Sequence, residues 1–342
     1  MRQEKVHTPA LEFMNQTVHD ELIAIRDLQI SIQSEGSFFE VVKGVSLSIR
    51  TNEIVCLVGE SGCGKSITAL SVMGLLPADV ARVTGGEILY RGQNLLGLKS
   101  RDMRRLRSDE ISMIFQDPIT SLDPVFTIGS LLQEVIQSHR KVSRSEAEKL
   151  AVRALEEAQL PDASKRMKSY PHELSGGMRQ RVMIALATAL NPSVLIADEP
   201  TTALDVTVQA QILESLRRRQ RELKMGMLLI THDLAVVAAV ADRVAVMYSG
   251  EIVEEASVND LFDNPKHPYT QGLMGAIPDI TARRGLLHAI PGRVPPPQVP
   301  PPGCEFAPRC SYSIGPCWEK RPALLPTSVG KLRCINPQPF SR

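Results

Sequence analysis

The chain has 342 residues, of which 43% are hydrophobic, so it can bury a full core and divide into one large domain and a smaller part. Its 39 Lys and Arg residues nearly balance its 38 Asp and Glu residues, which excludes a general electrostatic attraction to nucleic acid. The first twenty residues lack the apolar stretch of a signal peptide, and the apolar run at 234–241 is much shorter than a membrane span. We therefore expect a soluble, cytoplasmic chain.

Short continuous apolar runs mark the predicted strands of the core. They are IVCLV (54–58), VLIA (194–197), MLLI (227–230) and VAVM (244–247). Such runs are typical of strands that are buried on both faces of a parallel sheet covered by helices. Helical spacing of apolar residues is found between them, at 67–76 and at 208–223. The core is therefore predicted to be α/β.

The stretch from about residue 120 to 190 is predicted to be mostly helical. Its strongest segment is 142–160, where Ser143 or Ser145 would cap the helix ahead of Glu146. We interpret the stretch as a helical subdomain that is inserted in the α/β core.

One motif predicts a nucleotide site. GESGCGKS (59–66) lies between the predicted strand 54–58 and a helix, and it fits G-x-x-x-x-G-K-[ST] in the context that the pattern requires. Its glycines let successive N–H groups surround phosphates, and the helix adds its positive N-terminal end. Lys65 would reach the β- and γ-phosphates, and Ser66 a Mg²⁺ ion. A purely structural glycine-rich turn is the alternative, although the strand, the Lys-Ser pair and the helix are all present. The predicted ATP-binding residues are Gly59, Glu60, Ser61, Gly62, Cys63, Gly64, Lys65 and Ser66, with Cys63 as a filler of the loop.

Carboxylates at the end of another predicted strand complete this site. SVLIADEP (193–200) supplies Asp198 for Mg²⁺ and Glu199 to orient or polarise the attacking water. Two acids after a strand are often only a solvated turn, but their coupling to the phosphate loop favours the functional interpretation. His232 follows the apolar run 227–230, and it could contact the γ-phosphate because ligands collect at the carboxyl edge of parallel strands. A lone histidine in this position is otherwise usually structural.

A second glycine motif, LSGGMRQR (174–181), gives the sequence its family resemblance. With it, residues 21–260 resemble the ATP-binding subunits of ABC transporters, which have a P-loop, RecA-like core. The resemblance implies that Gln116 is the Q-loop glutamine and a further Mg²⁺ ligand, that TTALD (201–205) is the D-loop with Asp205, and that His232 is the switch histidine. It also implies an aromatic residue stacked on adenine. Phe39 is favoured over Phe38 for that role, although either could be a packing residue.

The signature motif also opens a predicted helix, so it forms a second anion site from glycine N–H groups, Ser175 and the helix dipole. One ATP needs only one such site. By the family pattern, the signature of one cassette covers the ATP held by another, head to tail. The chain has a single set of motifs, so its partner would be a second copy or a related ATPase subunit. The signature residues are Leu174, Ser175, Gly176, Gly177 and Met178.

The C-terminal part is similar to a narrower group, the ATPases of dipeptide and oligopeptide importers and related nickel systems. The matching segments are NPKHPYTQGL (264–273), IPGRVPPP (290–297) and GCEFAPRC (303–310). The resemblance implies a subunit that powers peptide import, placed peripherally at the cytoplasmic face of the inner membrane, with two transmembrane permease subunits and a solute-binding protein as partners. It divides the chain into a flexible N-terminus (1–20), an ABC ATPase domain (21–260) and a C-terminal extension (261–342).

Other functions stay open at this point. A nickel or other small-solute importer would use the same ATPase. ABC cassettes that act in nucleic-acid repair or translation commonly carry two cassettes or a long coiled-coil insertion, and this chain has neither. A cassette that does not hydrolyse ATP is disfavoured because Glu199 and His232 are both present.

Four cysteines crowd into the C-terminal extension behind a proline-rich linker that begins near residue 290. In the importer group these residues hold a [4Fe–4S] cluster. Four thiolates in a short cytosolic module suit iron–sulfur or Zn²⁺ better than disulfides, and the lack of a C-x-x-C pair argues against zinc. Four unrelated structural cysteines are the third possibility. We expect this module to have a core separate from that of the ATP site. The cysteines are Cys304, Cys310, Cys317 and Cys334.

Overall fold

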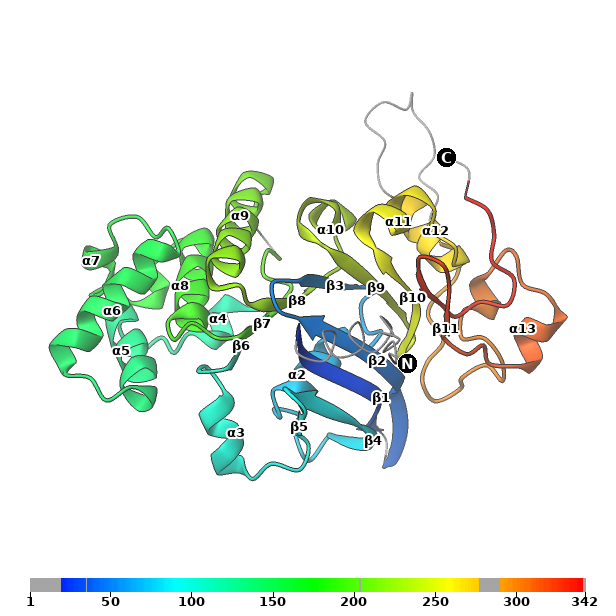
Figure 1. Ribbon diagram of the computed structural model, residues 1–342, viewed down its shortest axis with the longest axis horizontal. Helices are drawn as coiled ribbons and strands as arrows, with labels where there is room; N and C mark the ends of the chain where they lie inside the picture. The colour runs from blue at the N-terminus through cyan, green and yellow to red at the C-terminus, as the bar shows by residue number, and fades with distance from the viewer. Residues whose placement is uncertain (1–19, 35, 203, 277–289, 341–342) are drawn as a thin grey trace, which may run out of the picture.

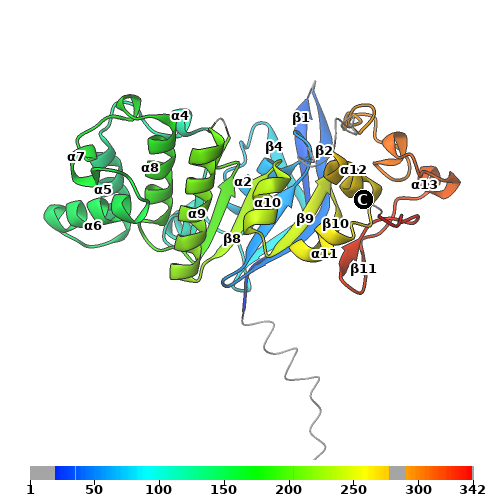
Figure 2. The same ribbon diagram turned by 90° about the horizontal axis from the view of Figure 1, so that it is seen from above.

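The computed structural model describes residues 20–34, 36–202, 204–276 and 290–340. The predicted flexible N-terminus lies almost entirely outside these residues. In Figures 1 and 2, a group of helices lies at one end of the molecule, the sheets lie in the middle, and the C-terminal segment lies at the other end.

The main sheet has a parallel centre with the strand order β9-β3-β8-β7-β6. These strands are β3 (Ile54–Val58), β6 (Ile111–Ile114), β7 (Val194–Asp198), β8 (Gly226–Thr231) and β9 (Arg243–Tyr248). Every residue of β3, β7 and β8 is buried, as their continuous apolar sequences predicted, and so is every residue of β6, which was not predicted. The predicted α/β core with a parallel sheet is confirmed.

Three antiparallel strands extend this sheet beyond β9. They are β10 (Glu251–Ser257), β12 (Gly330–Leu332) and β11 (Leu325–Pro326). The chain thus returns from the C-terminal segment to pair with β10, so that Gly330 lies opposite Ala256. A side chain on Gly330 would meet the Glu255 carbonyl oxygen at 1.9 Å, so the close pairing requires glycine here.

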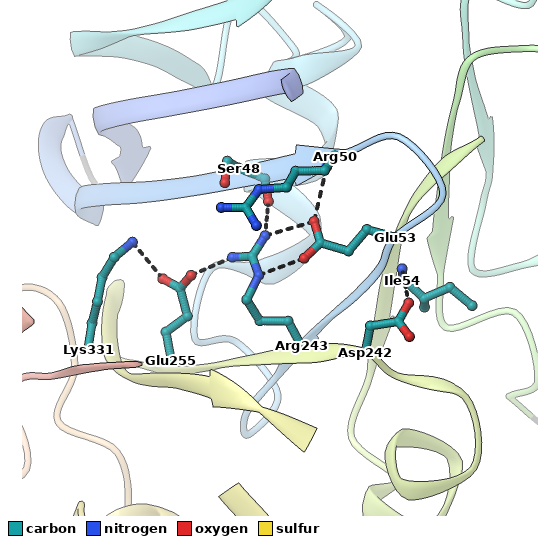
Figure 3. Close-up of polar contacts among 8 residues, drawn as sticks. All are labelled: Ser48, Arg50, Glu53, Ile54, Asp242, Arg243, Glu255 and Lys331. Atoms are coloured by element: carbon teal, nitrogen blue, oxygen red, sulfur yellow. Dashed lines mark hydrogen bonds and ion pairs between the residues drawn. The ribbon is translucent and has the colours of Figure 1, made fainter. Parts of the chain in front are cut away.

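A network of charged side chains ties this edge of the sheet together (Figure 3). Arg243 donates two hydrogen bonds to Glu53, at 2.9 and 3.0 Å, and also contacts Glu255. Lys331 donates to the other oxygen of Glu255 at 3.0 Å. Because these residues come from β9, β10, β12 and the position just before β3, the C-terminal hairpin is held to the parallel centre by polar contacts as well as by strand pairing.

A second, antiparallel sheet has the order β2-β1-β4-β5. Its strands are β1 (Glu21–Ser34), β2 (Ser37–Arg50), β4 (Ala81–Tyr90) and β5 (Gln93–Asn94). It shares a core with one face of the main sheet, to which β3 contributes Val55 and Leu57. Cys56 and Val58 face the other side and join the core beneath the helices. The alternation of neighbouring residues along β3 thus separates the two cores.

The helical group contains the predicted inserted helices. They are α4 (Pro118–Ser121), α5 (Ile128–His139), α6 (Arg144–Glu157), α7 (Ala163–Arg166), η1 (Pro171–Glu173) and α8 (Gly176–Thr188). Ser143 caps α6, because its hydroxyl accepts the Glu146 N–H at 3.2 Å. Of the two serines that the sequence offered, the structure uses the first.

The remaining helices lie beside the sheets and in the C-terminal part. They are α2 (Lys65–Val72), α3 (Ser100–Leu106), α9 (Val206–Leu223), α10 (Leu234–Val240), α11 (Val258–Asp263), α12 (Pro268–Gly275), η2 (Ala307–Arg309) and α13 (Gly315–Glu319). No helix among the described residues has both the length and the apolar character needed to cross a membrane.

The C-terminal segment packs into the main core, so the expectation of a separate core is wrong. Phe306 is 4% exposed and belongs to the same buried cluster as Val58 of β3. Its ring lies 5.2 Å from the Tyr248 ring and 5.4 Å from the Tyr269 ring, measured between centroids. A segment this short has too little apolar area for a core of its own, so its large aromatic residue is buried against the sheet.

Candidate functional site

The phosphate loop connects the end of β3 to the start of α2. Gly62 and Gly64 have φ values of 80° and 106°, which favour glycine. A side chain on Gly59 would meet the Met247 carbonyl oxygen at 2.1 Å, so β9 approaches the loop too closely for another residue. Lys65 is buried, and its Nζ donates to the carbonyl oxygens of Gly59 at 2.8 Å and Glu60 at 3.0 Å. The loop thus has the compact form that its motif predicted.

A cavity of about 280 Å³ opens beside this loop. Its lining residues are Ile32, Val41, Ser61, Gly62, Gly64, Lys65, Ser66, Ile67, Gln116 and Glu199. Residues from four distant parts of the sequence, including Gln116 and Glu199, therefore meet at one hollow. Both of these residues were predicted from the sequence to serve the ATP site.

Asp198 is the last residue of β7 and is 4% exposed. Burial raises the pKa of its carboxyl group above the usual range, although a hydrogen bond from Ser66 acts in the opposite direction. Its Oδ1 atom is buried and has no hydrogen-bond partner among the described residues. A buried carboxylate oxygen without a partner suits a hard divalent cation such as Mg²⁺, so the residues fit the predicted metal ligand.

Glu199 turns away from the strand with a φ of 46°. Its carboxylate accepts hydrogen bonds from Gln116 Nε2 at 3.1 Å and Thr202 Oγ1 at 2.9 Å, and His232 Nδ1 lies 3.2 Å from the other oxygen. Burial alone would raise the pKa of Glu199, but the hydrogen bonds from Thr202 and His232 outweigh it and hold the pKa below its usual range. Glu199 is therefore kept ionised and fixed in direction, as a group that orients water must be.

Thr202 is a member of this cluster that the sequence analysis did not single out. It lies inside the TTALD segment, three residues after Glu199, so its spacing was a usable signal.

The signature motif forms the N-terminus of α8. The Ser175 hydroxyl accepts the Met178 N–H at 3.4 Å and caps the helix, while Leu174 is buried beneath it. Ser175 and Gly176 are exposed. None of the five signature residues is among those that line the cavity of the phosphate loop. Figure 1 shows α8 within the helical group and α2 below the main sheet, so the two glycine motifs of one chain do not face a common ligand.

The D-loop aspartate has a local structural role in this chain. Asp205 caps α9 by accepting the Val208 N–H at 2.9 Å. Val208 in turn lies against Gly177 of the signature. The D-loop and the signature are therefore neighbours in one chain.

Aliphatic side chains, not aromatic ones, line the cavity on the side of the antiparallel sheet. Ile32 and Val41 face the cavity. Phe39 pairs with Ile32 across β1 and β2 but lines a different hollow, together with prolines of the 297–302 segment. The guanidinium of Arg82 covers the Phe38 ring at 3.7 Å. Stacking of adenine on Phe39 therefore stays a prediction.

The prediction of a [4Fe–4S] cluster, with Zn²⁺ as the alternative, is wrong. All four C-terminal cysteines line one small cavity of about 20 Å³, yet the described residues contain no group of three or more His, Cys, Asp or Glu side chains that could hold a metal ion. Burial raises the thiol pKa of Cys304 and Cys310, and that of Cys334 to about 11, so these thiols are protonated in the metal-free protein at neutral pH. Cys304 and Cys310 instead pack against the main core as small apolar residues.

Fold and site together define a P-loop ATPase cassette. Two family models match the sequence: "ABC transporter" over residues 42–202, and "Oligopeptide/dipeptide transporter, C-terminal region" over residues 253–317. The chain belongs to the ATP-binding proteins of ABC transporters, and it is an ATPase of that type.

Similarity to individual proteins supports the same family. The chain is 50% identical over 306 residues to a probable peptide ABC transporter ATP-binding protein, y4tR, of Sinorhizobium fredii, covering 89% of this chain and 91% of the relative. It is 47% identical over 298 residues to the dipeptide transport ATP-binding protein DppD of Bacillus subtilis, covering 87% and 89% of the two chains. Among solved structures, it resembles the dimeric, post-hydrolysis ATP-binding cassette MJ0796 bound to ADP and Pi, with a TM-score of 0.62, 28% identity, and coverage of 69% of this chain and 99% of that one.

Proposed function

We propose that this chain is the ATP-hydrolysing subunit of an importer for dipeptides or oligopeptides. The choice of solute rests on one observation. Residues 253–317, which lie outside the general ABC transporter match, match the oligopeptide/dipeptide transporter C-terminal region. The names of the most similar relatives support the same choice over nickel import and over repair or translation.

For the reaction, Lys65 and the N–H groups of the phosphate loop would bind the phosphates of ATP. Ser66, Asp198 and Gln116 would hold Mg²⁺, which when bound neutralises charge on the phosphate oxygens. The carboxylate of Glu199, held by Thr202, would orient the attacking water. His232 Nδ1 donates to the ionised Glu199 carboxylate at 3.2 Å, and from there His232 would position the γ-phosphate.

A second cassette would complete the site. The exposed N-terminus of α8 offers glycine N–H groups and Ser175, but it does not face the cavity of its own chain. A head-to-tail pair, which the family resemblance implies, would place this helix end over the phosphates held by the partner. The MJ0796 cassette, which this chain resembles, is dimeric. Bound ATP then joins the two cassettes, and its hydrolysis lets them separate.

The other proposed partners are two permease subunits and a solute-binding protein. Through the permeases the chain would be held at the cytoplasmic face of the membrane. Cycles of cassette closure would then drive the permeases, and we propose no nucleic acid as a partner.

Glu199→Gln tests the ATPase part of the proposal in the complex with its permeases. We expect unchanged ATP affinity, because the groups that bind the phosphates remain, and a loss of ATP hydrolysis and peptide uptake of about 100-fold or more. Glu148→Gln, on the exposed face of α6, is the matched control and should behave like the wild type. Full hydrolysis by Glu199→Gln would contradict the role of Glu199.

Uptake measured with the wild-type complex tests the solute. Labelled di- and oligopeptides should be taken up, and Ni²⁺ should not. Uptake of Ni²⁺ alone would support the nickel alternative, and stimulation of the ATPase by nucleic acid would support a role in repair or translation.

A further inference from the structure

The second residue of the phosphate loop is bound by the C-terminal segment. The two terminal nitrogens of Arg309 contact the two carboxylate oxygens of Glu60, at 2.7 and 3.0 Å. The side chain of Arg309 is 5% exposed and that of Glu60 is 28% exposed. Two parallel, charge-assisted hydrogen bonds between planar groups fix direction as well as distance.

Arg309 is itself held on its other sides. Its Nε donates to the Pro291 carbonyl oxygen at 2.9 Å, and its guanidinium lies 5.7 Å from the centre of the Tyr248 ring. The guanidinium therefore joins the proline-rich segment, β9 and the phosphate loop.

The backbone of Glu60 is held as well. Its N–H donates to the Tyr269 hydroxyl at 2.9 Å, and Tyr269 is fully buried in α12. Its carbonyl oxygen accepts from Lys65 Nζ at 3.0 Å and from the Cys63 N–H at 3.3 Å. The residue that Arg309 and Tyr269 anchor is thus the same one whose carbonyl oxygen contacts the lysine of the ATP site.

We propose that Arg309 is a positioning residue for ATP binding, which acts on the phosphate loop through Glu60. A loop that is held in shape before ATP arrives loses less conformational freedom when ATP binds. Removal of the anchor should therefore weaken binding of the phosphates without changing the groups that orient water. By this contact the C-terminal segment, which shares no motif with the ATP site, acts on that site. The inference rests on the proposed role of the phosphate loop.

The first test compares two arginines of the C-terminal segment. Arg309→Met removes the charge and keeps an unbranched aliphatic stem of similar length. Arg321→Met is the matched control, because Arg321 also pairs with a glutamate, Glu251 at 2.7 Å, but on β10 and not on the loop. We expect the Kd for ATP of Arg309→Met to rise about tenfold, which corresponds to about 1.4 kcal/mol. Arg321→Met should bind ATP as the wild type does.

Steady-state kinetics separate positioning from a general structural role. In Arg309→Met, KM for ATP should rise while kcat at saturating ATP stays within about twofold of the wild type, because the water-orienting groups are untouched. Arg309→Lys, which keeps the charge but loses the paired contact, should fall between wild type and Arg309→Met. A fall in kcat with KM unchanged, or equal effects of Arg309→Met and Arg321→Met, would overturn the proposal.

A double-mutant cycle tests whether Arg309 acts through Glu60. If it does, Arg309→Met should add little to the loss of affinity already caused by Glu60→Gln. Fully additive losses would show that the two residues act separately and would overturn the inference. The melting temperatures of the ATP-free variants are measured alongside, and Arg309→Lys replaces Arg309→Met in the cycle if the latter does not fold.

Lys65→Ala distinguishes failure of this inference from failure of the proposed site. If Lys65→Ala loses ATP-dependent thermal stabilisation while Arg309→Met binds ATP normally, only the role of Arg309 is wrong. If Lys65→Ala still binds ATP, the proposed phosphate site itself is wrong, and the inference falls with it.

Discussion

Asp198 and Glu199 are consecutive residues, yet their surroundings shift their pKa values in opposite directions. Asp198 ends a strand that is buried on both faces, so burial raises its pKa. Glu199 leaves the strand with a positive φ and reaches hydrogen-bond donors on Thr202 and His232, which lower its pKa despite burial. Two adjacent carboxylates can thus serve different purposes, one as a cation ligand and one as a fixed, ionised base.

Asp198→Asn should stabilise the protein without ATP and Mg²⁺. The raised pKa means that the folded state binds the proton of the Asp198 carboxyl group more tightly than the unfolded chain does. The charged form of Asp198 therefore opposes folding at neutral pH. Removing the charge should raise the melting temperature at pH 7 by roughly 2 °C. The gain should shrink as the pH falls through the folded pKa of Asp198, and it should vanish below the unfolded value.

Thermal unfolding between pH 4 and 8, with Asp79→Asn as an exposed control, measures this effect. Asp198→Asn should also lose the Mg²⁺-dependent part of the stabilisation by ATP. If the melting temperature of Asp198→Asn were higher than that of the wild type by the same amount at every pH, a buried charge could not be the cause.

Binding of the adenine ring of ATP should depend more on Ile32 than on Phe39. Ile32 lines the cavity of the phosphate loop, whereas Phe39 lines a separate hollow. On this geometry, we expect Ile32→Ala to weaken binding of ATP several-fold while it leaves binding of tripolyphosphate unchanged. Phe39→Ala should affect neither ligand. If Phe39→Ala weakens ATP by about tenfold or more instead, the aromatic ring stacks on adenine as the family resemblance implied.

At the scale of elements, the N-termini of α8 and α9 lie against each other. A side chain on Gly177 would meet Val208 Cγ1 at 2.7 Å, whereas one on Gly176 would meet only Leu204 Cδ2 at 3.6 Å. Asp205, which caps α9, accepts from the same Val208. The signature and the D-loop are thus packed as one unit, and the second glycine is needed for that contact.

Gly177→Ala should therefore destabilise the protein by about 1–3 kcal/mol, because the added methyl group overfills the contact. Gly176→Ala should be neutral or slightly stabilising, since it has room and alanine favours the helix. Chemical denaturation measures both. Val208→Ala in the Gly177→Ala background should restore part of the loss, and an unchanged loss in that double variant would contradict the steric cause.

The end of α2 illustrates what an element's sequence leaves undecided. Apolar spacing predicted a helix over 67–76, but α2 spans Lys65–Val72. Gly74 takes a φ of 59°, and Arg107 donates to the carbonyl oxygens of Met73 and Gly74 at 2.8 and 2.7 Å. The helix therefore stops just before a glycine in the left-handed region, and a distant arginine, which no local pattern shows, satisfies the carbonyl groups of the C-cap residue and of that glycine.

At the scale of the whole molecule, the proposed head-to-tail pair would place the phosphate loop and the signature in opposite halves of two composite sites. Two inactive variants should for this reason complement each other. Lys65→Ala abolishes phosphate binding at the phosphate loop, and Ser175→Arg blocks the signature. A pair with one chain of each variant therefore retains one complete site, made of the intact loop of one chain and the intact signature of the other. An equal mixture of the two, assembled with the permeases, should recover roughly a quarter of wild-type ATPase activity if the sites are independent. No recovery in mixed complexes that contain both variants would contradict the shared sites.

Much of the fold and of the candidate site could be predicted because the signals are local. Buried parallel strands are continuous apolar runs, so β3, β7, β8 and β9 were predicted within one or two residues. The phosphate loop was predictable because one short peptide supplies its glycines, lysine and serine. The antiparallel strands β1, β2 and β4 were not, since they mix buried, partly buried and exposed residues, and β1 pairs with the distant β4 as well as with β2.

By itself, the sequence determined the ATPase class and the identity of its motif residues, because each motif acts through backbone groups and side chains a few positions apart. Only the tertiary structure decided which distant groups meet. Arg309 reaches Glu60 across 249 residues of sequence, and Ile32 reaches the cavity that Phe39 was expected to line. It also decided that Cys304 and Cys310 are partly buried thiols packed against the main core, because burial and the direction of a side chain depend on what the rest of the chain places around it.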